Sequence, residues 1–390
     1  MTQFGYFADI SLTEAFKQFI NSEKSGSLLL IASTIAALLI ANSSYGPSYL
    51  DYLHLPIFGM SLEHWVNDGL MAIFFLLIGL ELERELYNGE LSDIRKAMLP
   101  IIAAIGGVAA PALIHLYFNL GLPTQSGIGI PMATDIAFAL GALAILGKHV
   151  PTSLKVFVVA FAIADDLIAI IVIALFYSNA ISIPFLLAAI MVLGILLAMN
   201  RLRVMLLLPY LVGGVVLWFF MLKSGIHVTL AGVLLAFAIP FSGKEEHDSP
   251  SERLEHYLLF PVSFVILPIF ALVNTGIVIS ADWATELTSN NSLGIILGLV
   301  AGKPIGILVA SILAIKFGFT KLPGDLNLKH LLGAGLLGGI GFTMSIFICN
   351  LAFYARADLI NASKMAILLA SLIAGCLGFL WLKFATYRND

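Results

Sequence analysis

Charged side chains are scarce in this chain of 390 residues. Asp, Glu, Lys and Arg together make up 11% of the sequence, whereas about a quarter of a soluble protein is charged. Hydrophobic residues account for 60%. So little charge cannot cover a water-exposed surface, and the composition therefore excludes an ordinary soluble protein. It indicates an integral membrane protein.

Cysteine is also nearly absent. The only two, Cys349 and Cys376, lie within apolar segments and lack the spacing of metal ligands. We interpret both as small core residues. Apolar segments are abundant instead, and their length of about 17–25 residues suits a helix that crosses a ~30 Å hydrocarbon core. They are continuous rather than alternating, which favours helices over a barrel of strands.

The apolar segments predict an all-α membrane protein with twelve transmembrane helices. The expected spans are 26–42, 65–80, 97–119, 128–147, 153–177, 182–199, 205–222, 226–241, 257–274, 293–315, 331–350 and 362–382. No loop is long enough for a soluble domain, so we treat residues 1–390 as one membrane domain. With the N-terminus in the cytoplasm, 16 of the 20 Lys and Arg residues fall on that side and three fall outside. This positive-inside bias predicts cytoplasmic N- and C-termini.

Two segments outside the spans have patterns of their own. Residues 1–25 carry apolar side chains on one face of a short helix. This helix either lies on the membrane surface or leads into the first span. The outer loop 43–64 combines aromatic and β-branched residues with Pro56 and Gly59. It is either a hairpin whose edge suits dimerisation or an interfacial loop.

Two adjacent carboxylates, Asp165 and Asp166, lie at the middle of span 153–177. A charge at bilayer depth costs at least about 2.5–3.5 kcal/mol, so such residues usually serve function. Adjacent helix residues point about 100° apart. One carboxylate can therefore face Lys303, the basic residue deep in span 293–315, while the other faces a cavity. Burial favours proton binding by a carboxylate, and hard cations such as Na⁺ and Li⁺ prefer oxygen ligands. Protons and cations would compete for these oxygens.

Spans 128–147 and 331–350 contain residues that disturb helices. The first contains Pro131 and the pair Thr134–Asp135, and the second contains five glycines. Glycine weakens a helix by about 1 kcal/mol per position, so the run indicates unwinding, although close glycine-mediated helix packing is an alternative.

These two spans are the middle members of two three-helix units, spans 3–5 and 10–12. Interrupted segments at corresponding positions indicate the inverted-topology repeats of secondary transporters. Interrupted helices leave partial charges at their ends. We expect Asp135 to compensate N-terminal ends and Lys303 to compensate C-terminal ends. Thr134 would add a hydroxyl ligand.

Further titratable residues lie near the predicted helix ends. Glu81 and Glu85 share one helix face. They form either a solvated helix end or a proton-binding cluster at the mouth of a funnel. Glu255 and His256 open the ninth span, and because histidine titrates near neutral pH, a pH-responsive cytoplasmic surface is a consistent interpretation. His227 begins span 8 and is more typical of an interfacial residue than of a ligand.

Seven sequence motifs stand out along the chain: WVNDGLMAIFFLLIGLELERE, PMATDIAFALGALAILG, AIADDLIAIIVIALFY, LKSGIHVTLAGV, RLEH, GKPIGI and GGIGFTMSIFI. Together they resemble the NhaA-type bacterial Na⁺/H⁺ antiporters, a family in which inverted repeats are described. The similarity covers nearly the whole chain, in the same order.

The resemblance implies a role for each matching residue. Asp165 and Asp166 correspond to the pair that binds the proton and the Na⁺ or Li⁺ ion. Lys303 corresponds to a lysine that bridges to Asp165, Asp135 to a carboxylate where the broken helices cross, and Thr134 to an ion ligand. The positions associated with pH response are Glu81, Glu85, Glu255, His256 and His227.

The resemblance also implies an activity. We expect a pH-regulated, electrogenic antiporter of the bacterial inner membrane that expels Na⁺ or Li⁺ with the inward proton gradient by alternating access. We expect a homodimer joined through loop 43–64. We expect no enzymatic activity, no cofactor and no nucleic-acid partner, with the bilayer, the cations and protons as the partners.

Three other classes fit the sequence less well. An intramembrane aspartyl protease needs two facing carboxylates and a GxGD motif, but the nearest stretch, Gly339 to Phe342, lacks the acid. A cation channel needs a continuous pore, and a buried carboxylate–lysine pair suits alternating access better than such a pore. A symporter of an organic anion would use broken helices but would not need so acidic a centre.

Overall fold

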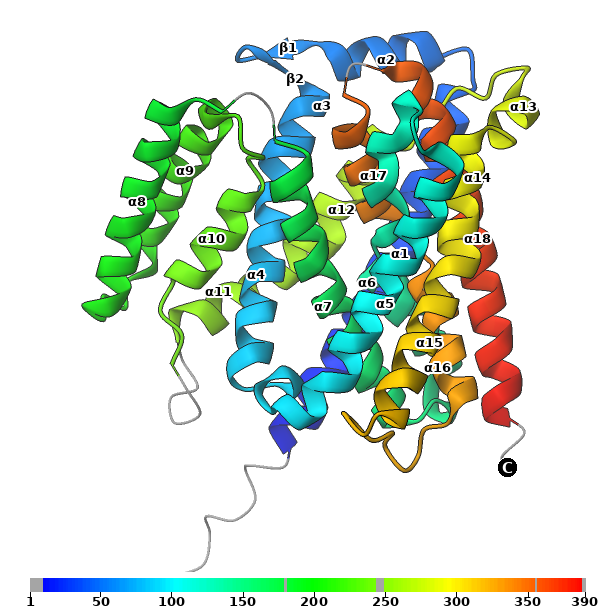
Figure 1. The fold of residues 1–390 in the computed structure, drawn as a ribbon. Helices are drawn as coiled ribbons and strands as arrows, with labels where there is room; N and C mark the ends of the chain where they lie inside the picture. The colour runs from blue at the N-terminus through cyan, green and yellow to red at the C-terminus, as the bar shows by residue number, and fades with distance from the viewer. Residues whose placement is uncertain (1–9, 179–180, 243–248, 355, 388–390) are drawn as a thin grey trace, which may run out of the picture.

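A computed structural model describes residues 10–178, 181–242, 249–354 and 356–387, which form a bundle of helices with one two-stranded hairpin (Figure 1). The first half contains α1 (Ile10–Ala41), α2 (Gly46–His54), β1 (Pro56–Ile57), β2 (Met60–Ser61), α3 (Leu62–His64), α4 (Met71–Tyr87), α5 (Ile94–Asn119), α6 (Ile136–Leu146) and α7 (Thr152–Phe176). The second half contains α8 (Ile183–Arg201), α9 (Leu207–Ser224), α10 (Leu230–Ala238), α11 (Pro250–Pro261), α12 (Leu267–Asn274), α13 (Trp283–Leu287), α14 (Asn290–Leu297), α15 (Lys303–Lys316), α16 (Leu328–Gly338), α17 (Phe342–Ala352) and α18 (Ala357–Tyr387).

Tighter and wider helical turns connect several of these helices. The 3₁₀ segments are η2 (Glu90–Ser92), η3 (Pro123–Met132) and η4 (Gly147–His149). The π-helical segments are η1 (Trp65–Leu70), η5 (Val262–Ile266) and η6 (Gly298–Gly302). The π segments join α3 to α4, α11 to α12 and α14 to α15, so that each set forms one long helical run.

Among the described residues, nine helical runs are long and apolar enough to cross a membrane, or up to 11 if two bent pairs each count as one span. The prediction of an all-helical membrane protein is confirmed. Of the twelve predicted spans, only 226–241 has no counterpart among these runs. It contains α10, whose nine residues rise only about 14 Å. The exact number of twelve therefore stays a prediction.

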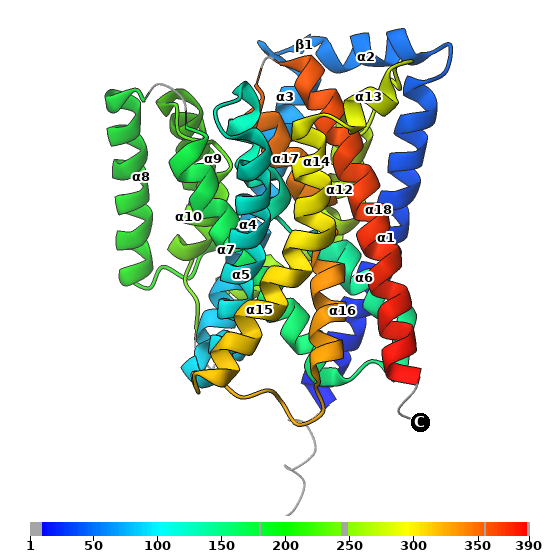
Figure 2. The same ribbon diagram turned by 45° about the vertical axis from the view of Figure 1, so that its right-hand side comes forward.

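The two ends of the bundle differ. Helix α1 begins and α18 ends at the same end, at the bottom of Figures 1 and 2, while α2 and the hairpin lie at the other end. Strand β1 pairs antiparallel with β2. The turn residues Phe58 (φ 50°) and Gly59 (φ 85°) both have positive φ, as tight hairpin turns of type I′ require.

The predicted N-terminal segment 1–25 is described only in part. Helix α1 runs without interruption from Ile10 to Ala41, so residues 10–25 continue directly into the first span. Residues 1–9 lie outside the described residues. Helix α2 then turns by 112° from α1, which places it across the end of the bundle (Figure 1).

The bundle consists of a side layer, formed by α8, α9 and α10, and a main body, formed by the other helices. Helices α8 and α9 stand at one edge in both views (Figure 2), and α10 lies between them and α4 (Figure 1). A Cβ atom added to Gly232 of α10 would lie 2.1 Å from the backbone oxygen of Ala72 in α4. Glycine at this position is therefore what allows the two helices to approach so closely, and it joins the side layer to the body.

Two interrupted helix pairs meet inside the main body. Segment η3 ends at Met132 and α6 begins at Ile136, while α16 ends at Gly338 and α17 begins at Phe342. The axes of α16 and α17 differ by 47°. The backbone N–H of Asp135 donates to the carbonyl of Ile340 at 2.6 Å, so the two interruptions contact each other directly.

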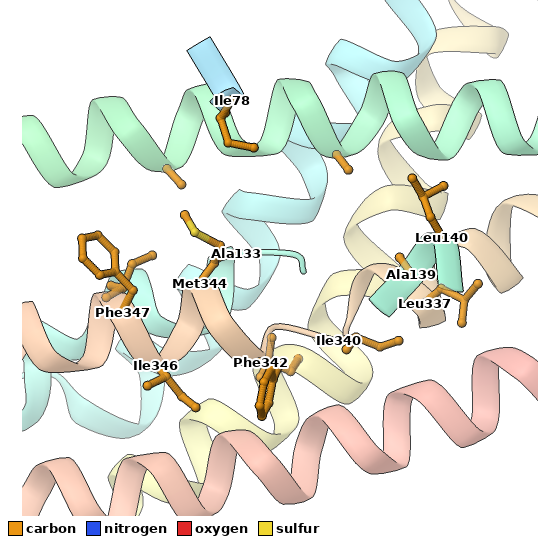
Figure 3. Close-up of a cluster of buried hydrophobic side chains, with 14 of the residues drawn as sticks. Ile78, Ala133, Ala139, Leu140, Leu337, Ile340, Phe342, Met344, Ile346 and Phe347 are labelled. Carbon is orange, nitrogen blue, oxygen red and sulfur yellow. The ribbon is translucent and has the colours of Figure 1, made fainter. Parts of the chain in front are cut away.

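Apolar side chains surround this contact. Ala133, within the first interruption, and Ile340, within the second, lie beside Phe342 and Met344 (Figure 3). All four are less than a tenth exposed. The polar backbone of both interruptions is thus enclosed in protein, which is the condition for non-helical backbone at membrane depth.

Candidate functional site

The two adjacent aspartates lie in the middle of α7 and take different environments. Both are buried, with exposed fractions of 0% for Asp165 and 2% for Asp166. The Oδ2 atom of Asp165 accepts a hydrogen bond from Lys303 Nζ at 2.8 Å. Asp166 instead lines a cavity. The Oδ1 atoms of both aspartates lack a hydrogen-bond partner among the described residues.

Lys303 is positioned by an irregular turn in its helix. It follows η6 and begins α15, and the next residue, Pro304, has no N–H for a regular helical bond. A π turn of this kind often marks a functional position. The lysine is completely buried, and its Nζ also donates to the carbonyl of Met132.

Asp135 accepts hydrogen bonds at two helix N-termini. Its Oδ1 accepts from the N–H of Phe138, in the first turn of α6, at 3.2 Å. Its Oδ2 accepts from the N–H and the hydroxyl of Thr343, at the start of α17, at 3.0 and 2.5 Å. One carboxylate therefore compensates the positive ends of both half-helices.

The C-terminal ends of the partner half-helices are also occupied. Lys303 donates to the last residue of η3, Met132. The hydroxyl of Thr134 donates to the carbonyl of Gly338, the last residue of α16, at 2.8 Å. Because this hydroxyl uses its proton on a carbonyl, its lone pairs stay available to a cation.

A cavity of about 50 Å³ connects these groups with the end of α4. Its polar wall consists of Glu81, Thr134, Asp135, Asp166, Ser263 and Thr343. This volume is enough for water. The other lining side chains are apolar, so a cation that enters would meet side-chain oxygen ligands only at these positions.

A second group of carboxylates surrounds Arg84 near the end of α4. Arg84 contacts Glu255 of α11 at 3.0 Å and Glu85 at 3.4 Å. Glu81, one turn earlier, is 7% exposed and lines the cavity. Glu83 accepts a hydrogen bond from Ser251 at 2.8 Å. These contacts make a buried acidic cluster with one guanidinium shared between α4 and α11.

The two predicted histidines lie apart from one another. His256 follows Glu255 on α11 but is exposed. His227 precedes α10, where its Nδ1 lies 2.7 Å from the hydroxyl of Thr229 and its ring meets Phe347 of α17 edge-on at 5.4 Å. The structure therefore brings together the carboxylates of the predicted pH-response set, and it places His227 against the core of α17.

Several polar contacts of the site are not specified by the sequence pattern. Thr343 makes two of the three hydrogen bonds to Asp135, and Ser345 donates to the carbonyl of Ile130 at 2.7 Å. Both belong to the GFTMSIF stretch, whose position directly after a glycine run was the available signal. In the sequence, Arg84 is distinguished only as a basic residue among neighbouring acidic ones.

The Asp135 contacts allow a direct test. The Asp135→Ala variant leaves three donors, two of them buried, without their acceptor, and we expect it to lose about 2–5 kcal/mol of stability. Asp135→Asn keeps one acceptor oxygen and should lose less. The measurement is the thermal unfolding midpoint in detergent, with the exposed Asp325→Ala as matched control. An Asp135→Ala midpoint equal to that of the control would contradict the capping role.

The fold and these buried charges define a multi-pass helical membrane protein with a polar centre. Among the described residues, no group of three or more His, Cys, Asp and Glu side chains is placed to hold a metal ion.

The family model described as Na⁺/H⁺ antiporter 1 matches residues 17–382. The chain belongs to this family, and the resemblance to NhaA-type proteins is confirmed.

Curated relatives match over nearly their full length. The chain is 63% identical to the Na⁺/H⁺ antiporter NhaA of Dechloromonas aromatica, with 97% of this chain and 98% of the relative covered. It is 55% identical to the NhaA of Cytophaga hutchinsonii, with 96% of each covered. It is 48% identical to the NhaA of Vibrio alginolyticus, with 96% of this chain and 98% of the relative covered.

Proposed function

We propose that the protein is a pH-regulated antiporter that exchanges cytoplasmic Na⁺ or Li⁺ for external H⁺. The observation that carries this proposal is the position of Asp166. It lies on the wall of a cavity, at the middle of a membrane helix, and it stands beside an aspartate that is already paired with a lysine. A carboxylate in this setting can bind a proton or a small cation, but both compete for the same oxygens.

Competition at one site gives exchange. Asp166 binds the cation when it is deprotonated, with the hydroxyl of Thr134 as a further ligand, and it releases the cation when it is protonated. Switching between the two sides only in the loaded states would then couple the two gradients. The inward proton gradient would drive sodium out of the cell, and exchange of more than one proton per cation would make transport electrogenic.

The Lys303–Asp165 pair is our candidate for the second proton-coupled step. Cation binding near Asp165 would compete with Lys303 for the carboxylate. A lysine without its counter-charge in an apolar surrounding favours the neutral form, so loss of this contact would release a proton. Either Asp165 or Lys303 then carries that proton, and both alternatives use the same 2.8 Å contact.

The interrupted helices support alternating access. We propose that η3 with α6, and α16 with α17, are two discontinuous transmembrane helices in inverted repeats that cover spans 3–5 and 10–12. With α10 counted as part of a span, the protein would cross the membrane twelve times. A site built where two half-helix pairs meet can open to either side when one repeat moves against the other.

The acidic cluster around Arg84 is our candidate for pH regulation. The cluster adjoins the cavity lined by Asp166, because one of its members, Glu81, lines this cavity too. Glu81 and Glu85 lie near the same end of α4. A change of protonation among the four carboxylates around the permanently charged guanidinium would alter the α4–α11 contact. His256 and His227 are secondary candidates.

Replacing Glu255 with Gln tests this regulation. We expect maximal exchange to persist and the pH of half-maximal exchange to move to lower values, because a cluster with one carboxylate fewer holds its remaining negative charges with less repulsion. The measurement is the exchange rate against pH in everted vesicles, with the Glu286→Gln variant on α13, a half-buried glutamate outside the cluster, as control. An unchanged profile would remove Glu255 from the mechanism.

The remaining expectations concern location and assembly. We propose the bacterial inner membrane, with both termini in the cytoplasm because the basic residues lie mainly at their end of the bundle. The hairpin of β1 and β2 would join two copies, since a two-stranded edge can pair with another chain. Transport needs no cofactor and no enzymatic step in this scheme.

Exchange in proteoliposomes tests the function. We expect Na⁺ and Li⁺, but not choline, to drive proton movement while the membrane potential is clamped. A cation channel would instead carry Na⁺ current with no coupled proton movement. Sodium flux that leaves the internal pH unchanged at every pH would contradict the proposal.

A further inference from the structure

A second and larger cleft lies at the end of the bundle where α5 and α7 begin. It has a volume of about 780 Å³, and it is enclosed by the starts of these two helices and by the loop between α15 and α16. That loop lies at the lower end of the molecule in Figure 2. None of the cleft residues belongs to the cation site, so its chemistry requires a separate explanation.

The charge in this cleft is mainly positive. Arg95, Lys96 and Lys321 line it, together with one carboxylate, Glu90. Lys96 lies 3.8 Å from Glu90, whereas Arg95 and Lys321 have no carboxylate partner among the described residues. Basic residues at the cytoplasmic end of a membrane protein are common. Here, however, two uncompensated cations line one concave surface rather than a flat one.

Thr320 adds a buried polar group to the wall of the cleft. Only 7% of its surface is exposed, and within the described part of the chain its hydroxyl makes no hydrogen bond. Buried hydroxyl groups nearly always have a partner. Since Thr320 lines the cleft, its hydroxyl can bond water or a ligand that enters the cleft.

The N-terminus of α7 supplies further donors. Thr152 and Ser153 line the cleft in the first turn of this 25-residue helix, and the preceding residue, Pro151, offers no side-chain cap. The first N–H groups of a helix lack intrahelical partners and attract anions. Helix α5 differs, because its cap residue Asp93 already accepts from the N–H of Arg95 at 2.9 Å.

We propose that this cleft binds a phosphate group through Arg95, Lys321, the Thr320 hydroxyl and the N-terminus of α7. The deeper wall is apolar and includes Leu99 and Phe157. This favours an anionic phospholipid, whose chain would continue along that wall, and a soluble phosphate compound shares the same recognition chemistry. The proposal does not depend on the exchange function.

Binding is measured by calorimetric titration of the purified full chain in detergent. The probes are dihexanoyl-phosphatidylglycerol, dihexanoyl-phosphatidylcholine and inorganic phosphate. We expect saturable binding of phosphatidylglycerol that weakens with salt. The Arg95→Gln/Lys321→Gln variant should bind at least about 10-fold more weakly, and Thr320→Val about 3-fold more weakly, because charge-assisted hydrogen bonds are the stronger ones.

The controls separate a built site from general positive charge. Lys316→Gln/Lys329→Gln removes two exposed lysines from the same end that do not line the cleft, and it should retain wild-type affinity. Lys321→Arg keeps the charge and should also bind. Circular dichroism and gel filtration check the fold of each variant.

Each outcome decides the proposal. Binding of phosphatidylglycerol alone identifies a lipid as the ligand, and binding of inorganic phosphate that the cleft variants abolish identifies a soluble anion. Absence of binding by both phosphatidylglycerol and inorganic phosphate, equal binding of phosphatidylcholine and phosphatidylglycerol, equal loss in both double variants, or wild-type affinity in the cleft variants would overturn it.

Discussion

We expect the Asp166→Asn variant to lose cation-driven proton exchange completely. The amide has nearly the size and shape of the carboxylate, so the variant should fold, but it cannot ionise at any accessible pH. It therefore neither binds nor releases a proton, and its NH₂ group places donors where a cation needs acceptors. Exchange in proteoliposomes should fall to the level of liposomes without protein, with both Na⁺ and Li⁺ and across the whole pH range.

Two comparisons make this result specific to the site. The Asp325→Asn variant makes the same chemical change on an exposed loop residue and should transport like the wild type. A thermal unfolding midpoint of Asp166→Asn at or above that of the wild type would exclude unfolding as the cause, since the substitution replaces a buried carboxyl group whose Oδ1 has no hydrogen-bond partner among the described residues. Exchange at wild-type rates in Asp166→Asn would refute the assignment of the site.

The division of labour between the two aspartates shows what sequence can specify. Adjacent positions on a helix point in different directions, so one of Asp165 and Asp166 was expected to face Lys303 and the other a cavity. The structure places Asp165 at 2.8 Å from Lys303 and Asp166 on a cavity wall. This was predictable because charges deep in a membrane span are few, and Lys303 is the one basic residue that lies deep inside a predicted span rather than near its end.

Backbone partners were beyond the reach of the sequence. The carbonyl of Met132 accepts from Lys303, and that of Ile340 accepts from the N–H of Asp135. Every residue has such groups, so nothing in the side-chain pattern distinguishes these two. Which carbonyls become free depends on where each helix unwinds, and a glycine run predicts unwinding only to within a few residues. In the structure, α16 ends at Gly338 and α17 begins at Phe342, and the position of this turn determines which carbonyls are free.

The predicted span 226–241 illustrates a different limit. Its apolar length suits a membrane helix, yet α10 covers only Leu230–Ala238. Thr229 precedes the helix, and Pro240, which lacks an N–H, follows it. Hydropathy measures the preference for an apolar environment, which protein neighbours satisfy as well as lipid does. Gly232, packed on the backbone of Ala72, places this segment against α4, so its environment is partly protein.

The Lys303→Ala variant has the second large expected effect, and it acts on stability as well as transport. It leaves Asp165 and the Met132 carbonyl without their shared donor in a fully buried position. Breaking a buried ion pair by removal of one partner costs about 3–5 kcal/mol. We expect a clearly lower thermal unfolding midpoint and, in the protein that remains folded, a changed pH profile of exchange and a changed transport current.

A double variant separates charge from packing. In Lys303→Met/Asp165→Asn neither partner is charged, so the penalty of an unpaired buried carboxylate disappears and most of the lost stability should return. The wild-type pH profile and current should not return with it, because the lysine-linked proton step is still missing, and the exchange that remains should move less charge per cation. A double variant as unstable as Lys303→Ala would mean that the lysine acts through packing. Wild-type current and pH profile in Lys303→Ala would show instead that Asp166 alone couples the two ions.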